Sequence, residues 1–224
     1  MTETSRPHIA DVIDPGDALG EVLFGLIMAL TFTVGSRLVF TGEGLNVREL
    51  TAATIGCNVA WGIIDAVLFV LGTVFYKSRR ARLFRQIKAA RSEREAISAL
   101  RKEFPLEGEP LVSAAADEEA LYQAMLGLTR RASPAKLRLK RDDLLAAFII
   151  FLLVSATSLP AVIPFFVIDS AELALRASNF LLIALLFTTG CAWARFSDAN
   201  PLNAGITMTC LGLVLVGIAI ALGG

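Results

Sequence analysis

Residues 51–76 read TAATIGCNVAWGIIDAVLFVLGTVFY, a stretch of 26 residues in which Asp65 is the only charged side chain. A helix needs about 20 mainly apolar residues to cross the hydrocarbon core of a bilayer, because inside lipid every backbone N–H and C=O must be hydrogen-bonded within the segment. The stretch therefore predicts a membrane-spanning helix, and it contains an ionisable group.

Four further apolar stretches meet the same criterion. They run over Leu19–Phe40, Leu144–Ile168, Ala177–Ala194 and Leu202–Leu222. The whole chain of 224 residues is 55% hydrophobic and 19% charged, which is typical of membrane proteins. We predict an all-α integral membrane fold of five transmembrane helices.

The basic residues are concentrated in one segment. Residues 77–141 carry 16 of the 21 Lys and Arg side chains, and basic segments are retained on the cytoplasmic side of membranes. The predicted organisation is a cytoplasmic tail (1–16), two spans (17–76), a cytoplasmic helical insert (77–141) and three spans (142–224). The N-terminus is then inside and the C-terminus outside, and the composition suggests a bacterial inner (plasma) membrane.

The insert has the pattern of amphipathic helices. Residues 77–103 contain neither Pro nor Gly, so we predict that they are helical and that the second span continues into the insert without a break. Their apolar stripe is Leu83, Ile87, Ile97 and Leu100. A second helix is predicted over Asp117–Arg131, with Leu121, Met125 and Leu128 on its apolar face.

Asp65 is the strongest functional candidate. It lies 16 residues after Glu49 and 12 before Lys77, which places it near mid-membrane at about 1.5 Å rise per residue. Intramembrane carboxylates are costly and typically mark ion or proton pathways. The alternative is a protonated Asp65 that hydrogen-bonds a neighbouring helix and only stabilises packing.

Glu21 is the second intramembrane candidate, and Asp17 and Met28 share its helix face. Asn58, seven residues before Asp65, lies on the face of Asp65 and offers a neutral oxygen to a cation. We predict a metal-binding set of Asp65, Glu21, Met28, Asn58 and Asp17, with Asp65 and Glu21 also relaying protons along a path of graded depth. The alternative places Glu21 at the membrane interface without a role.

Two further patterns bear on function. Pro160 and Pro164 interrupt the third span, and broken helices often line transport sites, although an ordinary kink is the alternative. A basic patch flanks the membrane and is predicted to contact anionic lipid headgroups. Its members are Arg79, Arg80, Arg82, Arg85, Lys136, Arg138, Lys140 and Arg141.

Enzymatic chemistry is not indicated. The chain has a single His, so it cannot assemble a Ser-His-Asp triad, and it has no nucleotide-binding glycine motif. Its three Cys residues lie in apolar stretches without metal-ligand spacing. We expect no permanently bound cofactor and no nucleic-acid partner.

The span order and three local stretches resemble the vacuolar iron transporter family. The stretches are LPAVIPFF (159–166), LFTTG (186–190) and NPLNAGITM (200–208), with a looser match at Phe24–Gly25. The resemblance implies a homodimer whose first helices meet at its axis and which exchanges protons for Fe²⁺ or similar ions through carboxylates of the first two spans and a methionine.

The match is not uniform along the chain. Aligning Phe24–Gly25 places Met28 and Ala29 where the family has an Asp-Gly pair, and Asp65 replaces the glutamate of the second span. The insert also lacks the dense, regular glutamates of the family's cytoplasmic metal site. The leading hypothesis is a proton-coupled divalent-cation (Fe²⁺ or Mn²⁺) transporter. The alternative is a non-transporting membrane protein whose basic helices bind a partner or anionic lipid.

Overall fold

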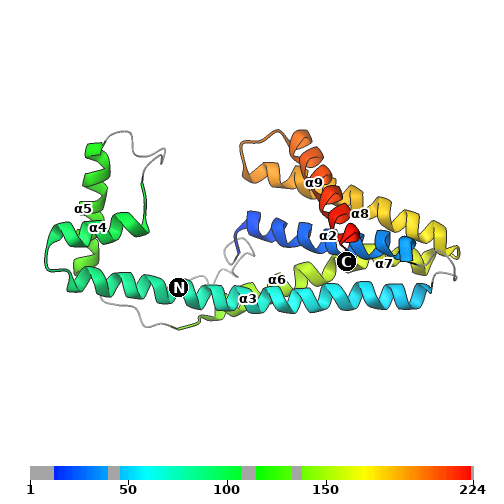
Figure 1. Ribbon diagram of the computed structural model, residues 1–224, viewed down its shortest axis with the longest axis horizontal. Helices are drawn as coiled ribbons and strands as arrows, with labels where there is room; N and C mark the ends of the chain where they lie inside the picture. Colours follow the sequence, from blue (N-terminus) through cyan, green and yellow to red (C-terminus); the bar gives the residue numbers. More distant parts are fainter. Residues whose placement is uncertain (1–12, 40–45, 107–114, 133–137, 223–224) are drawn as a thin grey trace, which may run out of the picture. The chain divides into compact units, whose positions relative to one another are not determined.

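The computed structural model describes residues 13–39, 46–106, 115–132 and 138–222, which form helices and no strand (Figure 1). They are α2 (Pro15–Val39), α3 (Val47–Ala89), α4 (Glu93–Glu103), α5 (Ala115–Arg131), α6 (Arg141–Ala156), α7 (Ser158–Val167), α8 (Ala171–Trp193), the 3₁₀ turn η1 (Ala194–Phe196) and α9 (Pro201–Ala221). The chain divides into a membrane unit, residues 1–69 and 141–224, and an insert unit, residues 70–140.

Among the described residues, five helical segments are long and apolar enough to span the membrane, as predicted. They are Pro15–Gly35, Val47–Ala89, Arg141–Val167, Ala171–Phe196 and Pro201–Ala221, and α6 and α7 together form the third. The fourth begins six residues earlier than predicted, because Ser170 accepts a hydrogen bond from the backbone N–H of Leu173 and so caps a polar first turn.

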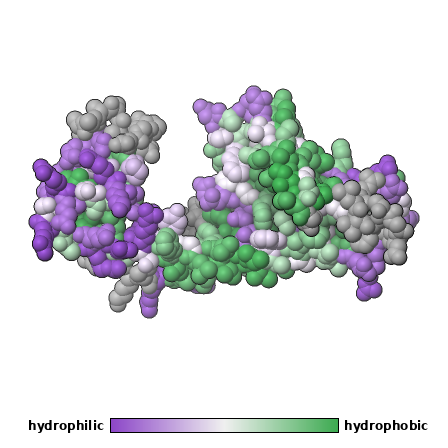
Figure 2. All heavy atoms as spheres, in the orientation of Figure 1, coloured by the Kyte–Doolittle hydropathy of each residue, from purple (hydrophilic) through white to green (hydrophobic). Residues whose placement is uncertain are grey.

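Helix α2 is the centre of the membrane unit. It packs against α6, α7, α8 and α9, and its buried residues Leu26, Ala29 and Leu30 meet Leu182 and Leu186 of α8. In the spanning stretch of α3, 6% of the residues are buried, against 44% in that of α2, so few of its side chains are buried in a single chain. Figure 2 shows apolar side chains over α9 and polar ones over the helices α4 and α5.

The first part of the insert unit contains two helices, the end of α3 and the whole of α4. Helix α3 continues beyond the apolar stretch, as predicted, and ends at Ala89, so residues 77–103 are helical in two parts, with an interruption between Ala89 and Glu93. The Ser92 hydroxyl accepts a hydrogen bond from the Glu95 N–H (3.2 Å), and the Glu95 carboxylate accepts one from the Arg91 N–H (2.9 Å). This reciprocal cap starts α4 without any Pro or Gly.

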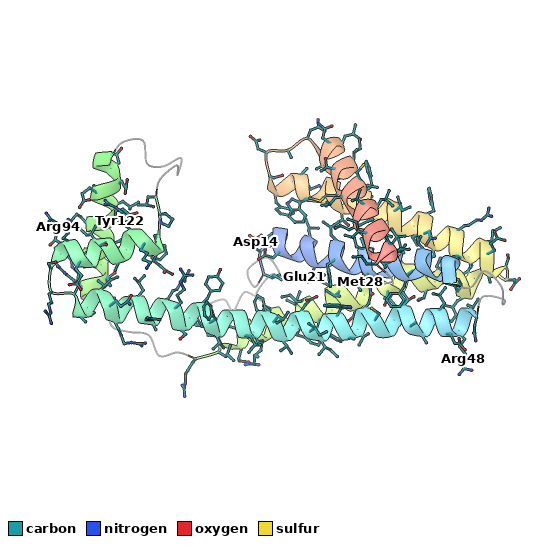
Figure 3. All side chains as sticks on the ribbon, in the orientation of Figure 1. Asp14, Glu21, Met28, Arg48, Arg94 and Tyr122 are labelled. Atoms are coloured by element: carbon teal, nitrogen blue, oxygen red, sulfur yellow. The ribbon has the colours of Figure 1, made fainter. Side chains whose placement is uncertain are left out.

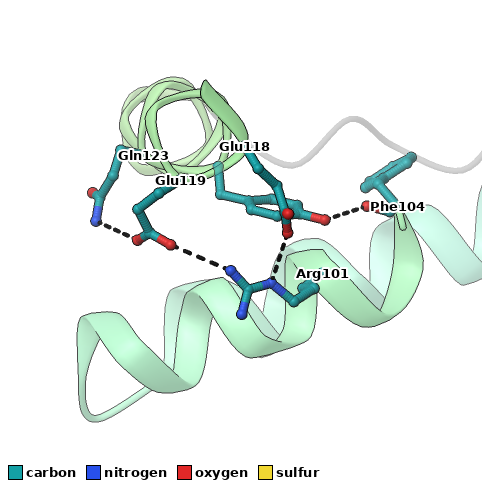
Figure 4. Close-up of polar contacts among 6 residues, drawn as sticks. Arg101, Phe104, Glu118, Glu119 and Gln123 are labelled. Carbon is teal, nitrogen blue, oxygen red and sulfur yellow. Dashed lines mark hydrogen bonds and ion pairs between the residues drawn. The ribbon is translucent and has the colours of Figure 1, made fainter. Parts of the chain in front are cut away.

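The apolar stripe of the insert is buried, as predicted, but α5 covers it with another face. Tyr122 and Leu126 are buried, whereas Leu121 and Leu128, placed on that face by the sequence pattern, are exposed. Polar contacts orient α5 in this way (Figure 4). The Tyr122 hydroxyl donates to the Phe104 carbonyl (2.7 Å), and Arg101 bridges to α5 through Glu118 (3.2 Å) and Glu119 (3.3 Å).

Candidate functional site

An acidic cleft of about 640 Å³ opens in the membrane unit. It carries four carboxylates, from Asp14, Asp17, Glu21 and Asp65, between apolar walls. Its other described lining residues are Ile13, Gly16, Gly20, Phe24, Phe69, Ile150 and Trp193, and none of the described lining residues is basic. We call this feature the acidic cleft.

The start of α2 supplies three of the four carboxylates. Asp14 precedes the helix, and its Oδ1 accepts a hydrogen bond from the Gly16 N–H (2.7 Å) while its carbonyl accepts from the Ala18 N–H (2.9 Å). Asp14, Asp17 and Glu21 are three and four residues apart, which places them on one helix face. Figure 3 shows Asp14, Glu21 and Met28 in order along this segment. Asp14 was not among the predicted site residues, although its position three residues before Asp17 indicates the same helix face.

Helix α3 brings the fourth carboxylate from the opposite side of the cleft. Phe24 of α2 meets Trp61 of α3 edge to face, with ring centroids 5.6 Å apart. Asp65 is one turn after Trp61, and Glu21 is about one turn before Phe24, so both line the same cleft.

The acidic cleft has the electrostatics of a cation site without being a complete one. Negative side chains between apolar walls concentrate cations, because the low-dielectric surroundings screen their field weakly. Asp65 Oδ2 is buried and has no hydrogen-bond partner in the described part of the chain. Yet no three Asp, Glu, His or Cys groups among the described residues are close enough to hold a metal ion together.

Asn58 occupies a helix junction rather than the acidic cleft. It is fully buried, and its Nδ2 donates to Gly25 O (3.1 Å), Thr157 Oγ1 (2.8 Å) and Val154 O (3.4 Å). Thr157 lies between α6 and α7, where the third span is interrupted. Asn58 therefore ties α2 and α3 to this break. Of the two prolines predicted to interrupt the span, Pro160 follows the break in the first turn of α7, and Pro164 lies inside α7.

Met28 and the basic patch lie apart from the lining residues. Met28 is half-buried on α2 and is not among the described residues of the acidic cleft. The patch residues on α3 are exposed, as are those at the start of α6 and just before it: Arg79, Arg80, Arg82, Arg85, Arg138, Lys140 and Arg141. Lys136 lies outside the described residues. Their contact with lipid stays a prediction.

A family model described as the VIT family matches residues 22–224. The chain belongs to the vacuolar iron transporter family. Membership of this VIT family makes it a multi-pass membrane protein and gives metal-ion transport, rather than an enzymatic reaction, as its general function. No curated protein sequence matches the chain.

The extent of the family match divides the acidic cleft. Asp65 falls within residues 22–224, whereas Asp14, Asp17 and Glu21 precede the match. The acidic residues in the first two turns of α2 therefore lie just before the region that the family model matches.

Proposed function

We propose that this VIT protein carries a divalent cation of the Fe²⁺ or Mn²⁺ type across the membrane in exchange for protons. The observation that carries the proposal is the acidic cleft, in which four carboxylates from two helices face apolar walls and no basic side chain is among the described lining residues. Carboxylate oxygens suit Mn²⁺ and related divalent ions.

Glu21 and Asp65 are the proposed transport ligands. Both lie within segments long and apolar enough to span the membrane. Asp14 and Asp17 are exposed at the start of α2, where negative charge attracts cations to the opening without holding them tightly. A cation would pass from Asp14 and Asp17 at the start of α2 to Glu21 and Asp65 within the membrane.

Proton exchange is expected because ionised carboxylates in the acidic cleft are energetically unfavourable when no cation is bound. Two ionised carboxylates between apolar walls are expensive unless a cation or protons neutralise them. When the metal ion leaves, protons on Glu21 and Asp65 restore neutrality. Each transported ion is therefore replaced by protons moving in the opposite direction.

A homodimer completes the ligand set in this proposal. The described residues of one chain bring no three metal-binding groups together, although transition-metal and alkaline-earth ions are usually held by several ligands at once. Two chains facing each other across the acidic cleft would contribute two copies of Glu21 and Asp65. The proposed orientation has the N-terminus and the insert in the cytoplasm of a bacterial cell and the C-terminus outside.

Transport in proteoliposomes tests the proposal. Purified full-length protein is reconstituted, and uptake of Fe²⁺ or Mn²⁺ is followed by a fluorescent metal indicator with and without an imposed pH gradient. We expect flux that rises with the gradient and falls at least about tenfold in Asp65→Asn and in Glu21→Gln, since each loses a charged ligand.

Asp142→Asn is the matched control. Asp142 is an exposed carboxylate in the first turn of α6 and does not line the acidic cleft, so this variant should transport like the wild type. Metal flux unchanged by Asp65→Asn would contradict the proposal and favour a membrane protein that kept the VIT fold without transport.

A further inference from the structure

A second cleft, in the insert unit, is independent of the acidic cleft. It has a volume of about 680 Å³ and lies between the last turns of α3 and the exposed face of α4. Its lining residues are Arg79, Arg82, Leu83, Gln86, Ala89, Glu95, Ser98, Ala99, Lys102 and Glu103. We call it the insert cleft. The small side chains Ala89, Ser98 and Ala99 leave the space open where the two helices face each other.

The carboxylates of the insert cleft are already engaged. Glu103 pairs with Arg79 at 2.8 Å, and Glu95 accepts the Arg91 N–H in the cap of α4. Arg82 and Lys102, one from each helix, have no hydrogen bond or ion pair with any described residue. Arg82 and Lys102 are thus two cations from different helices that line one hollow, while Glu103 is paired with Arg79 and Glu95 is hydrogen-bonded to the Arg91 N–H. This arrangement favours an anion between the two cations.

Neutral donors complete the lining. The Gln86 amide and the Ser98 hydroxyl lie on the same two helix faces as Arg82 and Lys102. A guanidinium, an ammonium, an amide and a hydroxyl that line one space suit the oxygen-rich surface of a phosphate group, which accepts several hydrogen bonds at once. The volume lies within the range of small-molecule sites, so a ligand with a body attached to its phosphate fits.

A smaller hollow of about 310 Å³ lies beside the insert cleft along α3. It is lined by Phe75, Ser78, Arg79 and Arg82, so it shares two arginines with the insert cleft. Phe75 is 65% exposed and belongs to the aromatic end of the apolar stretch of α3. An apolar surface thus adjoins the cationic side chains along one helix face.

We propose that the insert cleft binds a phosphate-bearing ligand, with Arg82 and Lys102 holding the phosphate and the Phe75 hollow receiving an apolar portion. The phosphate belongs either to an anionic phospholipid headgroup or to a soluble phosphate ester. This site goes beyond metal transport and depends on no residue of the acidic cleft.

Binding to the full-length protein in neutral detergent tests the site. One arm titrates glycerol 3-phosphate by calorimetry, and the other titrates fluorescent short-chain phosphatidic acid, with phosphatidylcholine as the zwitterionic reference. Binding of phosphatidic acid alone assigns the site to a lipid headgroup, and binding of both assigns it to phosphate esters generally. Binding of neither probe would overturn the proposal.

Matched variants separate a built site from general attraction by basic residues. Arg82→Gln with Lys102→Gln should weaken binding at least about tenfold, because two charge-assisted contacts are lost. Arg85→Gln with Arg94→Gln removes the same charge from the same two helices, but neither residue lines the insert cleft, so the dissociation constant should stay within about twofold. Equal losses in the two double variants would overturn the proposal.

A third variant guards against misfolding. Ser98 is exposed, so Ser98→Glu places a carboxylate in the insert cleft while leaving every cation in position. It should abolish binding with an unchanged melting temperature. Retained binding in this folded variant would also overturn the proposal.

Discussion

Gly25 of α2 is the most restricted position in the helix junction beside the acidic cleft. A Cβ atom there would overlap Thr157 Oγ1 and would lie 3.0 Å from the Val154 carbonyl oxygen. The Gly25 carbonyl also accepts a hydrogen bond from Asn58 (3.1 Å). Gly25→Ala must therefore displace Thr157 or separate α2 from the break between α6 and α7.

The magnitude follows from three terms. Overpacking a close contact costs about 1–3 kcal/mol. Moving Thr157 also strains its local hydrogen bond to the Val154 carbonyl (2.6 Å) and the hydrogen bond that it accepts from Asn58 of α3 (2.8 Å), and interhelical bonds within membranes average about 0.6 kcal/mol. Replacing Gly by Ala within a helix returns up to about 1 kcal/mol. We expect Gly25→Ala to destabilise the fold by about 1–3 kcal/mol.

Unfolding of the purified protein in detergent measures this effect. Gly56→Ala on α3 is the control, because a Cβ there meets nothing within 4 Å, so it should be neutral or slightly stabilising. Adding Thr157→Ala removes the overlapping side chain and should recover part of the loss, which gives a coupling energy of at least about 0.5 kcal/mol. Strict additivity, or a Gly25→Ala protein as stable as the wild type, would refute the reasoning.

Three further outcomes follow from the packing. Gly190→Ala should destabilise the contact of α8 with α9, since its Cβ would lie 2.8 Å from the Ala204 carbonyl oxygen, whereas Gly217→Ala, with open space around it, should not; equal unfolding midpoints would contradict this. Tyr122→Phe should cost the insert unit about 1 kcal/mol, measured by hydrogen exchange of α4 and α5, because it loses the bond to the Phe104 carbonyl. Ser92→Ala should fray the start of α4 by about 1 kcal/mol in the same measurement; unchanged exchange there would show that the cap is dispensable.

The sequence determined the elements of the fold. Five apolar stretches specify five spans, because lipid allows an isolated backbone no alternative to internal hydrogen bonding. Pro160 marked the interruption of the third span, which lies just before it at Thr157, because proline cannot donate the helix hydrogen bond, whereas Pro164 lies inside α7 without ending it. Asp65 and Glu21 could be recognised as candidate site residues from the sequence, because a charge in an apolar membrane segment is energetically costly whatever its neighbours are.

The tertiary structure decided which residues share a space. Periodicity places side chains on a face but does not say what that face meets, so it could not distinguish Asn58, used at a helix junction, from Asp65, which lines the acidic cleft. Nor could it show that Tyr122 rather than Leu121 faces the insert core, because the polar contacts of α5 set its rotation.

The two clefts themselves are properties of helix pairs. Asp14 lines the acidic cleft because the segment at the start of α2 lies beside α3. Arg82 and Lys102 line the insert cleft together because α3 lies beside α4. Local energetics written in the chain determine where helices form. The distances between charges on different helices depend on packing, and packing is decided by the whole fold.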